Sequence, residues 1–167
     1  METKILALDL GSVIGWATTK SFGSYRLPYK KSDPHTQLCI RLDKLERFIS
    51  EQCKKHNIKS ILVESPYYNK FGGVLRTIYY MHCIVEMFCW KNKIPYHSMT
   101  PSQARKIITS KGRLSKSEII KFANKHLVKK YKNTIFNKVS NDHEADALVL
   151  LHAFIKKEEE KTKKIWK

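Results

Sequence analysis

Two apolar runs that each end on a carboxylate constrain the fold of this chain most. Lys4–Asp9 reads KILALD, and Ile58–Glu64 reads IKSILVE. Near-continuous apolar runs of this length are typical of strands buried on both faces of a sheet. A carboxylate that closes such a strand is costly to bury unless it is paired or binds a cation. A helix cap or a loop hydrogen bond would explain either carboxylate alone, but two in neighbouring strands indicate a site.

The remaining signals alternate between strands and helices and predict a mixed sheet with helices packed on it. Further strands are expected at Trp16–Thr19, near Ser24–Leu27 and at Pro95–Met99, with Gly11 and Gly15 bracketing a tight turn. Helices are expected from His35 to Lys55, from about Phe71 to Lys91, and after capping signals that begin at Thr100, Ser115 and Asn141. The predicted order is β-β-β-α-β-α-β-α-α-α.

The charge of the chain indicates a polyanionic partner. The 167 residues hold 32 Lys and Arg against 15 Asp and Glu, a formal net charge of +17. Such an excess on a folded domain most often serves to bind nucleic acid, although solubility alone is an alternative reason for a high lysine content. Lysine predominates over arginine, which favours binding of the phosphate backbone over base reading.

Several other classes of protein are disfavoured. No apolar run has the length of a membrane span, and the first residues resemble a strand more than a signal or transit peptide. The four cysteines lack CxxC spacing, so we expect neither a zinc site nor a disulfide framework. A reducing compartment fits best. The excess of lysine over arginine and the lack of a transit-peptide pattern are associated with bacterial and phage proteins, so we expect the cytoplasm of a bacterial or phage-infected cell.

A third acidic group begins the last predicted helix. Helical spacing places Asp142, His143 and Asp146 on one side, while Glu144 points away and serves the capping box. The helix dipole alone would explain Asp142 and Glu144, because acidic residues are favoured at helix N-termini. It explains Asp146 poorly, because this residue lies beyond the first turn.

Three groups of carboxylates on converging elements suit a hard divalent cation such as Mg²⁺. Two such ions about 3.5–4 Å apart can activate a water and stabilise the leaving oxygen of a phosphodiester. Together with the positive charge of the chain, this predicts a metal-dependent nuclease.

Four segments resemble the RuvC family of Holliday-junction resolvases and occur in that family's order. They are DLGSVIGWA (Asp9–Ala17), LVES (Leu62–Ser65), PSQARKIITSKGRLSKSEI (Pro101–Ile119) and HEADALVLLHA (His143–Ala153). The resemblance implies an α/β, RNase H-like fold with a mixed five-stranded sheet flanked by helices. One such domain would span residues 1–167, with a basic helical tail from about residue 156. It further implies a homodimer that resolves four-way and other branched DNA by paired symmetric nicks, using Mg²⁺ or Mn²⁺ as two ions per site and no small-molecule cofactor.

The resemblance also assigns the candidate catalytic and metal-binding residues. Asp9 matches the first-strand aspartate of the family, Glu64 its glutamate and Asp146 the aspartate of ADAL. The family position three residues before that aspartate is Asp in some members and His in others. Here it is His143, which we favour over the adjacent Asp142 as a metal ligand or water-activating base. The alternative for His143 is an ordinary surface histidine at a helix start.

DNA-binding residues follow from the same resemblance. Tyr67 matches an aromatic position thought to stack on bases at the open centre of a junction. Arg105 and Lys116 match basic positions near the scissile phosphate, and Lys111 and Arg113 are expected to extend this surface. The alternative for the basic residues is that they lie on ordinary solvated helix faces. The alternative for Tyr67 is that it is a half-buried surface aromatic.

The predicted helix from about Phe71 to Lys91 is apolar almost all round. The resemblance implies that it forms the dimer contact, and burial in the core is the alternative.

Two further classes of function compete with the resolvase hypothesis. One is an RNase H-like nuclease of the ribosomal-RNA processing type, and the other is a junction-binding protein without catalysis. An actin-like ATPase would need a second phosphate-binding strand–turn unit, which is not visible in the sequence.

Overall fold

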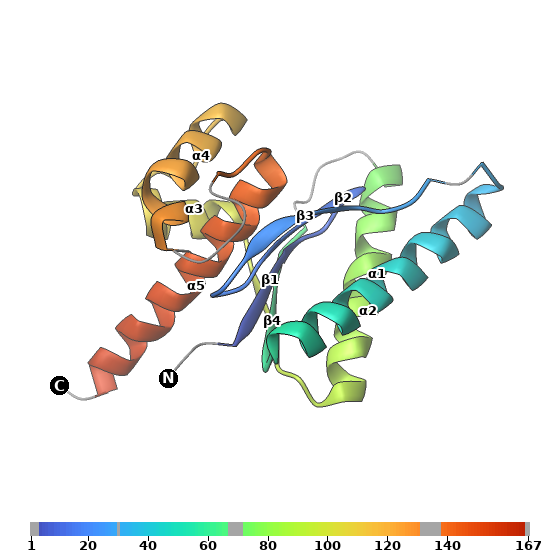
Figure 1. Ribbon diagram of the computed structural model, residues 1–167, viewed down its shortest axis with the longest axis horizontal. Helices are drawn as coiled ribbons and strands as arrows, with labels where there is room; N and C mark the ends of the chain where they lie inside the picture. Colours follow the sequence, from blue (N-terminus) through green and yellow to red (C-terminus); the bar gives the residue numbers. More distant parts are fainter. Residues whose placement is uncertain (1–3, 30, 67–71, 131–137, 166–167) are drawn as a thin grey trace.

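A five-stranded sheet forms the centre of the computed structural model, which describes residues 4–29, 31–66, 72–130 and 138–165. The strands are β1 (Ile5–Asp9), β2 (Val13–Ala17), β3 (Phe22–Arg26), β4 (Ser60–Glu64) and β5 (Tyr96–Met99). Their spatial order is β3-β2-β1-β4-β5 (Figure 1). Strand β2 runs antiparallel to both of its neighbours, β1 and β3, whereas β1, β4 and β5 run parallel. The predicted mixed five-stranded sheet is confirmed.

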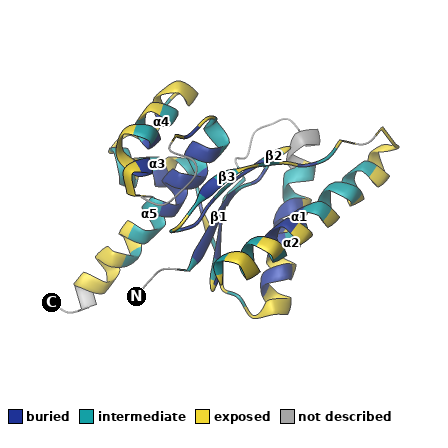
Figure 2. Ribbon diagram, viewed as in Figure 1, coloured by how far each residue is buried: buried dark blue, intermediate teal, exposed yellow. Residues whose placement is uncertain are grey.

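Helices cover both faces of this sheet (Figure 1). One face carries α1 (Pro34–His56) and α2 (Gly72–Asn92), and the other carries α3 (Pro101–Thr109), α4 (Lys116–Phe122) and α5 (Asp142–Ile165). A π-helical turn (Ala123–Leu127) and a 3₁₀ turn (Val128–Lys130) continue α4. The first half of α5 is buried against β1 and β2, and its second half extends into solvent (Figure 2). None of the described helices has the length and apolar character that crossing a membrane requires.

Local capping chemistry begins the helices where the sequence predicts. Thr100 and Ser115 each form a complete capping box, with Gln103 and Glu118 as the reciprocal partners. Ser110 ends α3 in the left-handed conformation, with φ of 63°.

The second strand differs from the prediction in its position. It spans Val13–Ala17 because all five residues pair with β3 and the last three also pair with β1. Thr18 already belongs to the turn, where its backbone N–H donates to the Ser21 carbonyl. Gly15 therefore lies inside β2, opposite Asp9, and not at the boundary of a tight turn. A glycine stands here because the start of α5 approaches β2 closely at this point.

Side-chain alternation along the central strands decides where their terminal carboxylates point. On β1, Leu6 and Leu8 pack in the core under α1 and α2, whereas Ile5 and Ala7 pack in the core under α5. Asp9 continues the second set and so faces α5. Glu64 does the same on β4, two residues after Leu62.

Candidate active site

Three carboxylates converge where β1 and β4 end beneath the first turns of α5. The register pairs Leu8 with Val63, so Asp9 and Glu64 are the next residues along two adjacent parallel strands. Burial, together with the charges of Asp9 and Asp146, raises the pKa of Glu64 to about 9. Burial also raises the pKa of Asp146, and the neighbouring Asp9 adds to that shift. The structure thus brings together the three acidic residues that the sequence singles out.

The acidic residues of this region are Asp9, Glu64, Asp142 and Asp146, and three of them contact a cationic or hydrogen-bonding side chain. Arg105 Nη2 lies 2.8 Å from Asp146 Oδ1, and His143 Nδ1 lies 2.9 Å from Asp9 Oδ2. Lys116 pairs with Asp142. The Nε atom of Arg105 is buried and has no hydrogen-bond partner among the described residues. The α3–α4 segment therefore supplies positive charge directly to the acidic cluster.

The two candidates for the fourth site position have different surroundings. The His143 imidazole is hydrogen-bonded to the carboxylate of Asp9. This hydrogen bond raises the pKa of His143. Asp142 instead binds Lys116, which lowers the pKa of the Asp142 carboxyl. Direct contact with Asp9 supports His143 for this position.

The chemistry of the cluster suits a hard divalent cation. Asp9, Glu64 and Asp146 offer carboxylate oxygens, the ligands that Mg²⁺ prefers, and their mutual repulsion would be relieved by a cation. Within residues 4–29, 31–66, 72–130 and 138–165, no three acidic, histidine or cysteine side chains are arranged to share one ion. Arg105 and His143 already contact two of the carboxylates. Ion binding therefore requires these side chains to rearrange.

Gly15 allows the start of α5 to reach the sheet. A Cβ atom at this position would overlap the backbone carbonyl of His143 and would lie 3.0 Å from its Cα. Because Gly15 is also paired with Asp9, this close approach brings His143 to the carboxylate of Asp9. The sequence predicts Gly15 as a turn residue. The residues around Gly15 carry no signal of a contact with His143, which is far away in the sequence.

Glu144 also holds the first turn of α5 in place, through hydrogen bonds to residues outside the helix. Its carboxylate accepts hydrogen bonds from Ser24 Oγ at 3.0 Å and from the Ser140 backbone N–H at 2.8 Å. The Glu144 N–H in turn bonds Asn141 Oδ1, as the predicted capping box requires. Ser140 precedes the helix cap and Ser24 belongs to β3. Glu144 therefore links α5 to the sheet and does not act only as a local cap.

Glu144→Ala is expected to destabilise the protein by about 2–3 kcal/mol, because Ser24 and Ser140 lose a buried charged acceptor. Glu144→Gln keeps one acceptor oxygen and can donate to Ser24, so it should stay within about 1 kcal/mol of the wild type. Chemical denaturation of the two variants measures both effects. Equal stability of the alanine variant and the wild type would contradict this role.

Glu64→Gln should remove a pH dependence from the stability of the metal-free protein. A carboxyl whose pKa is about 9 when folded and about 4.5 when unfolded binds more protons in the folded state between those pH values. Its contribution to stability is therefore complete below about pH 4.5 and is lost as the pH rises to about 9. The free energy of unfolding should fall by up to about 1.4 kcal/mol per pH unit in this window, and less in Glu64→Gln. Denaturation in EDTA from pH 5 to 9 tests this, and parallel curves for the two proteins would contradict it.

The predicted DNA-binding residues fall into two groups. Lys111, Arg113 and Lys116 are exposed on the α3–α4 connection and the start of α4, close in sequence to the cationic partners of the site. Arg105 is largely buried and contacts Asp146. Tyr67 lies outside the described residues.

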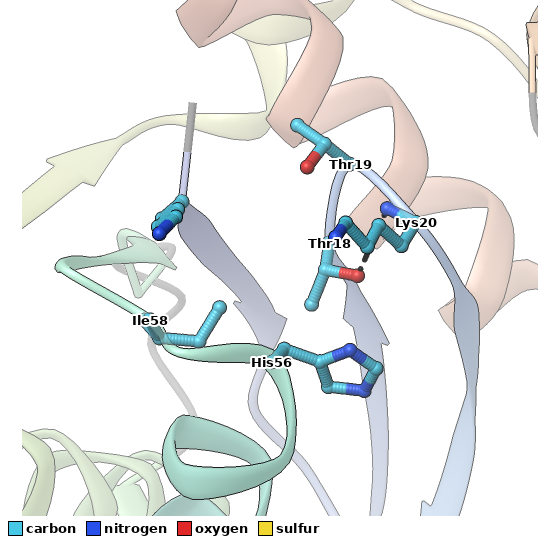
Figure 3. A pocket seen from close by; sticks show the side chains of 6 residues that line it. Thr18, Thr19, Lys20, His56 and Ile58 are labelled. Atoms are coloured by element: carbon cyan, nitrogen blue, oxygen red, sulfur yellow. Dashed lines mark hydrogen bonds between the residues drawn. The ribbon is translucent and has the colours of Figure 1, made fainter. Parts of the chain in front are cut away.

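A small cavity lies at the opposite end of the central strands from the acidic cluster. Thr18, Lys20 and His56 are among the residues that line it (Figure 3). Its volume of about 10 Å³ is enough for one water at most. It has no part in the acidic site.

Comparison with solved structures identifies this arrangement of elements. RuvC from Thermus thermophilus superposes with a TM-score of 0.67 at 14% identity, covering 95% of this chain and 96% of that one. The chain has the RuvC fold. This fold is RNase H-like, as the resemblance implies. T. thermophilus RuvC in complex with a Holliday junction substrate gives a TM-score of 0.67 at 13% identity, covering 91% of this chain and 92% of that one.

Another similar structure comes from yeast. The yeast mitochondrial Holliday junction resolvase Ydc2 has a TM-score of 0.62 at 13% identity, covering 93% of this chain and 78% of that one. No protein-family model matches the sequence, and no curated protein matches it. The likeness is therefore one of fold.

Proposed function

We propose that this chain is a metal-dependent endonuclease that cuts branched DNA, four-way junctions in particular, by phosphodiester hydrolysis. The observation that carries the proposal is the convergence of Asp9, Glu64 and Asp146 at the ends of two parallel strands, with Arg105 beside them. Two proteins that share the RuvC fold are a Holliday junction resolvase and a RuvC bound to a Holliday junction. The net charge of +17 suits a DNA substrate.

Each side chain of the site has a role in this proposal. Asp9, Glu64 and Asp146 would hold Mg²⁺ or Mn²⁺, with His143 as a further ligand or as the base toward water. Bound there, two ions would activate a water and compensate the charge that develops at the reacting phosphate. Arg105 contacts Asp146, and Lys116 contacts Asp142 on the same first turns of α5. Both cations would bind oxygens of the scissile phosphate when the substrate is present.

A cleavage assay distinguishes this function from the competing ones. A synthetic four-way junction, a linear duplex of the same sequence and a single-stranded RNA are incubated with the protein in Mg²⁺, in Mn²⁺ and in EDTA. We expect symmetric nicks in the junction that require the metal. Cleavage of the RNA alone would favour an RNA-processing nuclease, and binding without cleavage in either metal would favour a non-catalytic junction protein.

We further propose a homodimer, because the described residues of one chain form one acidic site and paired nicks need two. One stripe of α2 supports a contact there: Tyr80, Cys83, Met87 and Trp90 are exposed at helical spacing. Trp90 is 82% exposed and Met87 51%, while Met81 and Val85 on the opposite side are buried in the core. A helix that is apolar on both sides is expected to bury both.

Trp90→Glu is therefore expected to convert the dimer to a monomer, because a charge replaces the largest exposed apolar side chain of the stripe. Light scattering behind a sizing column measures the mass. Tyr29→Glu is the control, since Tyr29 is 79% exposed but lies outside α2. An unchanged dimer in Trp90→Glu would place the subunit contact elsewhere.

A further inference from the structure

A groove separates the first turns of α1 from α2, on the face of the sheet that α5 does not cover. It has two lobes of about 290 and 320 Å³. Pro34, Leu38 and Thr77 line both lobes, so the lobes are parts of one groove. None of the residues proposed for metal or DNA binding lines it.

Each lobe carries one arginine. Arg41 lines the first lobe, and its buried Nε atom has no hydrogen-bond partner among the described residues. Arg76 lines the second lobe, where its guanidinium lies 5.5 Å from the centre of the Tyr80 ring and its Nε donates to Tyr80 Oη at 3.2 Å. This bond uses Nε, so the two Nη groups can still bind an anion. The groove thus presents two oriented guanidinium groups, and a buried donor that lacks an acceptor marks one of them.

Among the described residues that line the groove, none carries a carboxylate. Asp33, beside the groove in the sequence, uses its carboxylate to accept the backbone N–H groups of His35 and Thr36 at the start of α1. Guanidinium groups without acidic partners match phosphate oxygens in geometry and charge. A second copy of this chain, at a net charge of +17, is a poor match for the same groove.

The connectivity of the sheet places this groove at the same end as the acidic site. Strands β1 and β4 end there with Asp9 and Glu64. Strand β2 is antiparallel to β1 and so begins at that end with Val13, which pairs with Arg26 at the end of β3. The chain enters α1 from β3 and α2 from β4, so both helices begin at that end. DNA that enters the acidic site from this end of the sheet can therefore continue over it to the groove.

We propose that the Arg41–Arg76 groove binds the sugar–phosphate backbone of the DNA at phosphates away from the one that is cut. This inference rests on the proposed function, since it assigns a second contact to the same substrate. The groove holds the arm of the junction that extends past the acidic site. Its arginines contribute to affinity and positioning and leave the reacting phosphate to the carboxylate cluster.

The test measures junction affinity against salt concentration. Arg41→Gln, Arg76→Gln and the double variant are made in an Asp9→Asn background, so that bound DNA is not cut. Each lost phosphate contact should flatten the slope of log K against log salt by about 0.9, and the double variant should bind roughly tenfold more weakly. Arg47→Gln is the matched control, because Arg47 is an exposed residue of the same helix that already pairs with Asp43 at 3.0 Å.

Junctions with progressively shorter arms add a second measurement. The wild-type slope should fall to that of the double variant once the arms no longer reach the groove. Wild-type slope and affinity in the double variant would overturn the inference, as would a change of oligomeric mass with the slope unchanged. If the wild type binds linear duplex as tightly as a junction while the double variant still loses slope, the groove contact stands and the proposed junction selectivity fails.

Discussion

Replacing Asp9 with asparagine should slow cleavage of a four-way junction by at least about a thousandfold, equivalent to roughly 4 kcal/mol of lost transition-state stabilisation. Asparagine has nearly the shape of aspartate but lacks its charge. The carboxylate cluster then has one charge fewer to hold a cation, and His143 Nδ1 loses its ionic partner. Single-turnover cleavage in Mg²⁺ measures the effect.

Junction binding by Asp9→Asn should stay within about twofold of the wild type, because the basic residues proposed to bind DNA are unchanged. Asp43→Asn is the control for the same chemical change, since Asp43 lies on α1 and pairs with the exposed Arg47. This control should cut at the wild-type rate. Equal cutting by Asp9→Asn would remove Asp9 from the mechanism.

Gly15→Ala is expected to have the largest effect on stability, about 3 kcal/mol or more. The added methyl group would overlap the backbone carbonyl of His143, and backbone cannot move aside as the end of a flexible side chain can. Moving the start of α5 away from β2 would also break the contact between His143 and Asp9. Thermal and chemical denaturation measure the loss.

Gly112→Ala is the matched control for this substitution. A Cβ atom at Gly112 would meet nothing within 4 Å, and its φ angle is not positive. This variant should be as stable as the wild type or more stable by up to about 1 kcal/mol, because alanine restricts the unfolded chain. Wild-type stability in Gly15→Ala would mean that α5 does not lie against β2 at this point.

Much of the fold could be predicted because its signals are local. The apolar runs before Asp9 and Glu64 predict two buried strands, and the Thr100 and Ser115 boxes mark two helix starts to the residue. The second strand was predicted two to three residues too late. Its position depends on pairing with β1 and β3, which no property of its own residues expresses.

The candidate site divides in a similar way. Asp9, Glu64 and Asp146 could be named from the sequence, because a carboxylate next to buried apolar residues is costly and therefore conspicuous. Arg105 could be named only as a basic residue on a helix. Its contact with Asp146 joins residues 41 positions apart, and helical or strand periodicity carries no signal over that separation.

The sequence by itself determined the strands and helices, the acidic residues and the positive charge, since these follow from side-chain chemistry and short-range spacing. Only the tertiary structure decided which side chains meet: His143 with Asp9, Arg105 with Asp146, and Glu144 with Ser24 on β3. It also decided that Gly15 is needed for space and not for a turn. The physical reason is that packing α5 onto the sheet sets these distances, and packing depends on all the elements together.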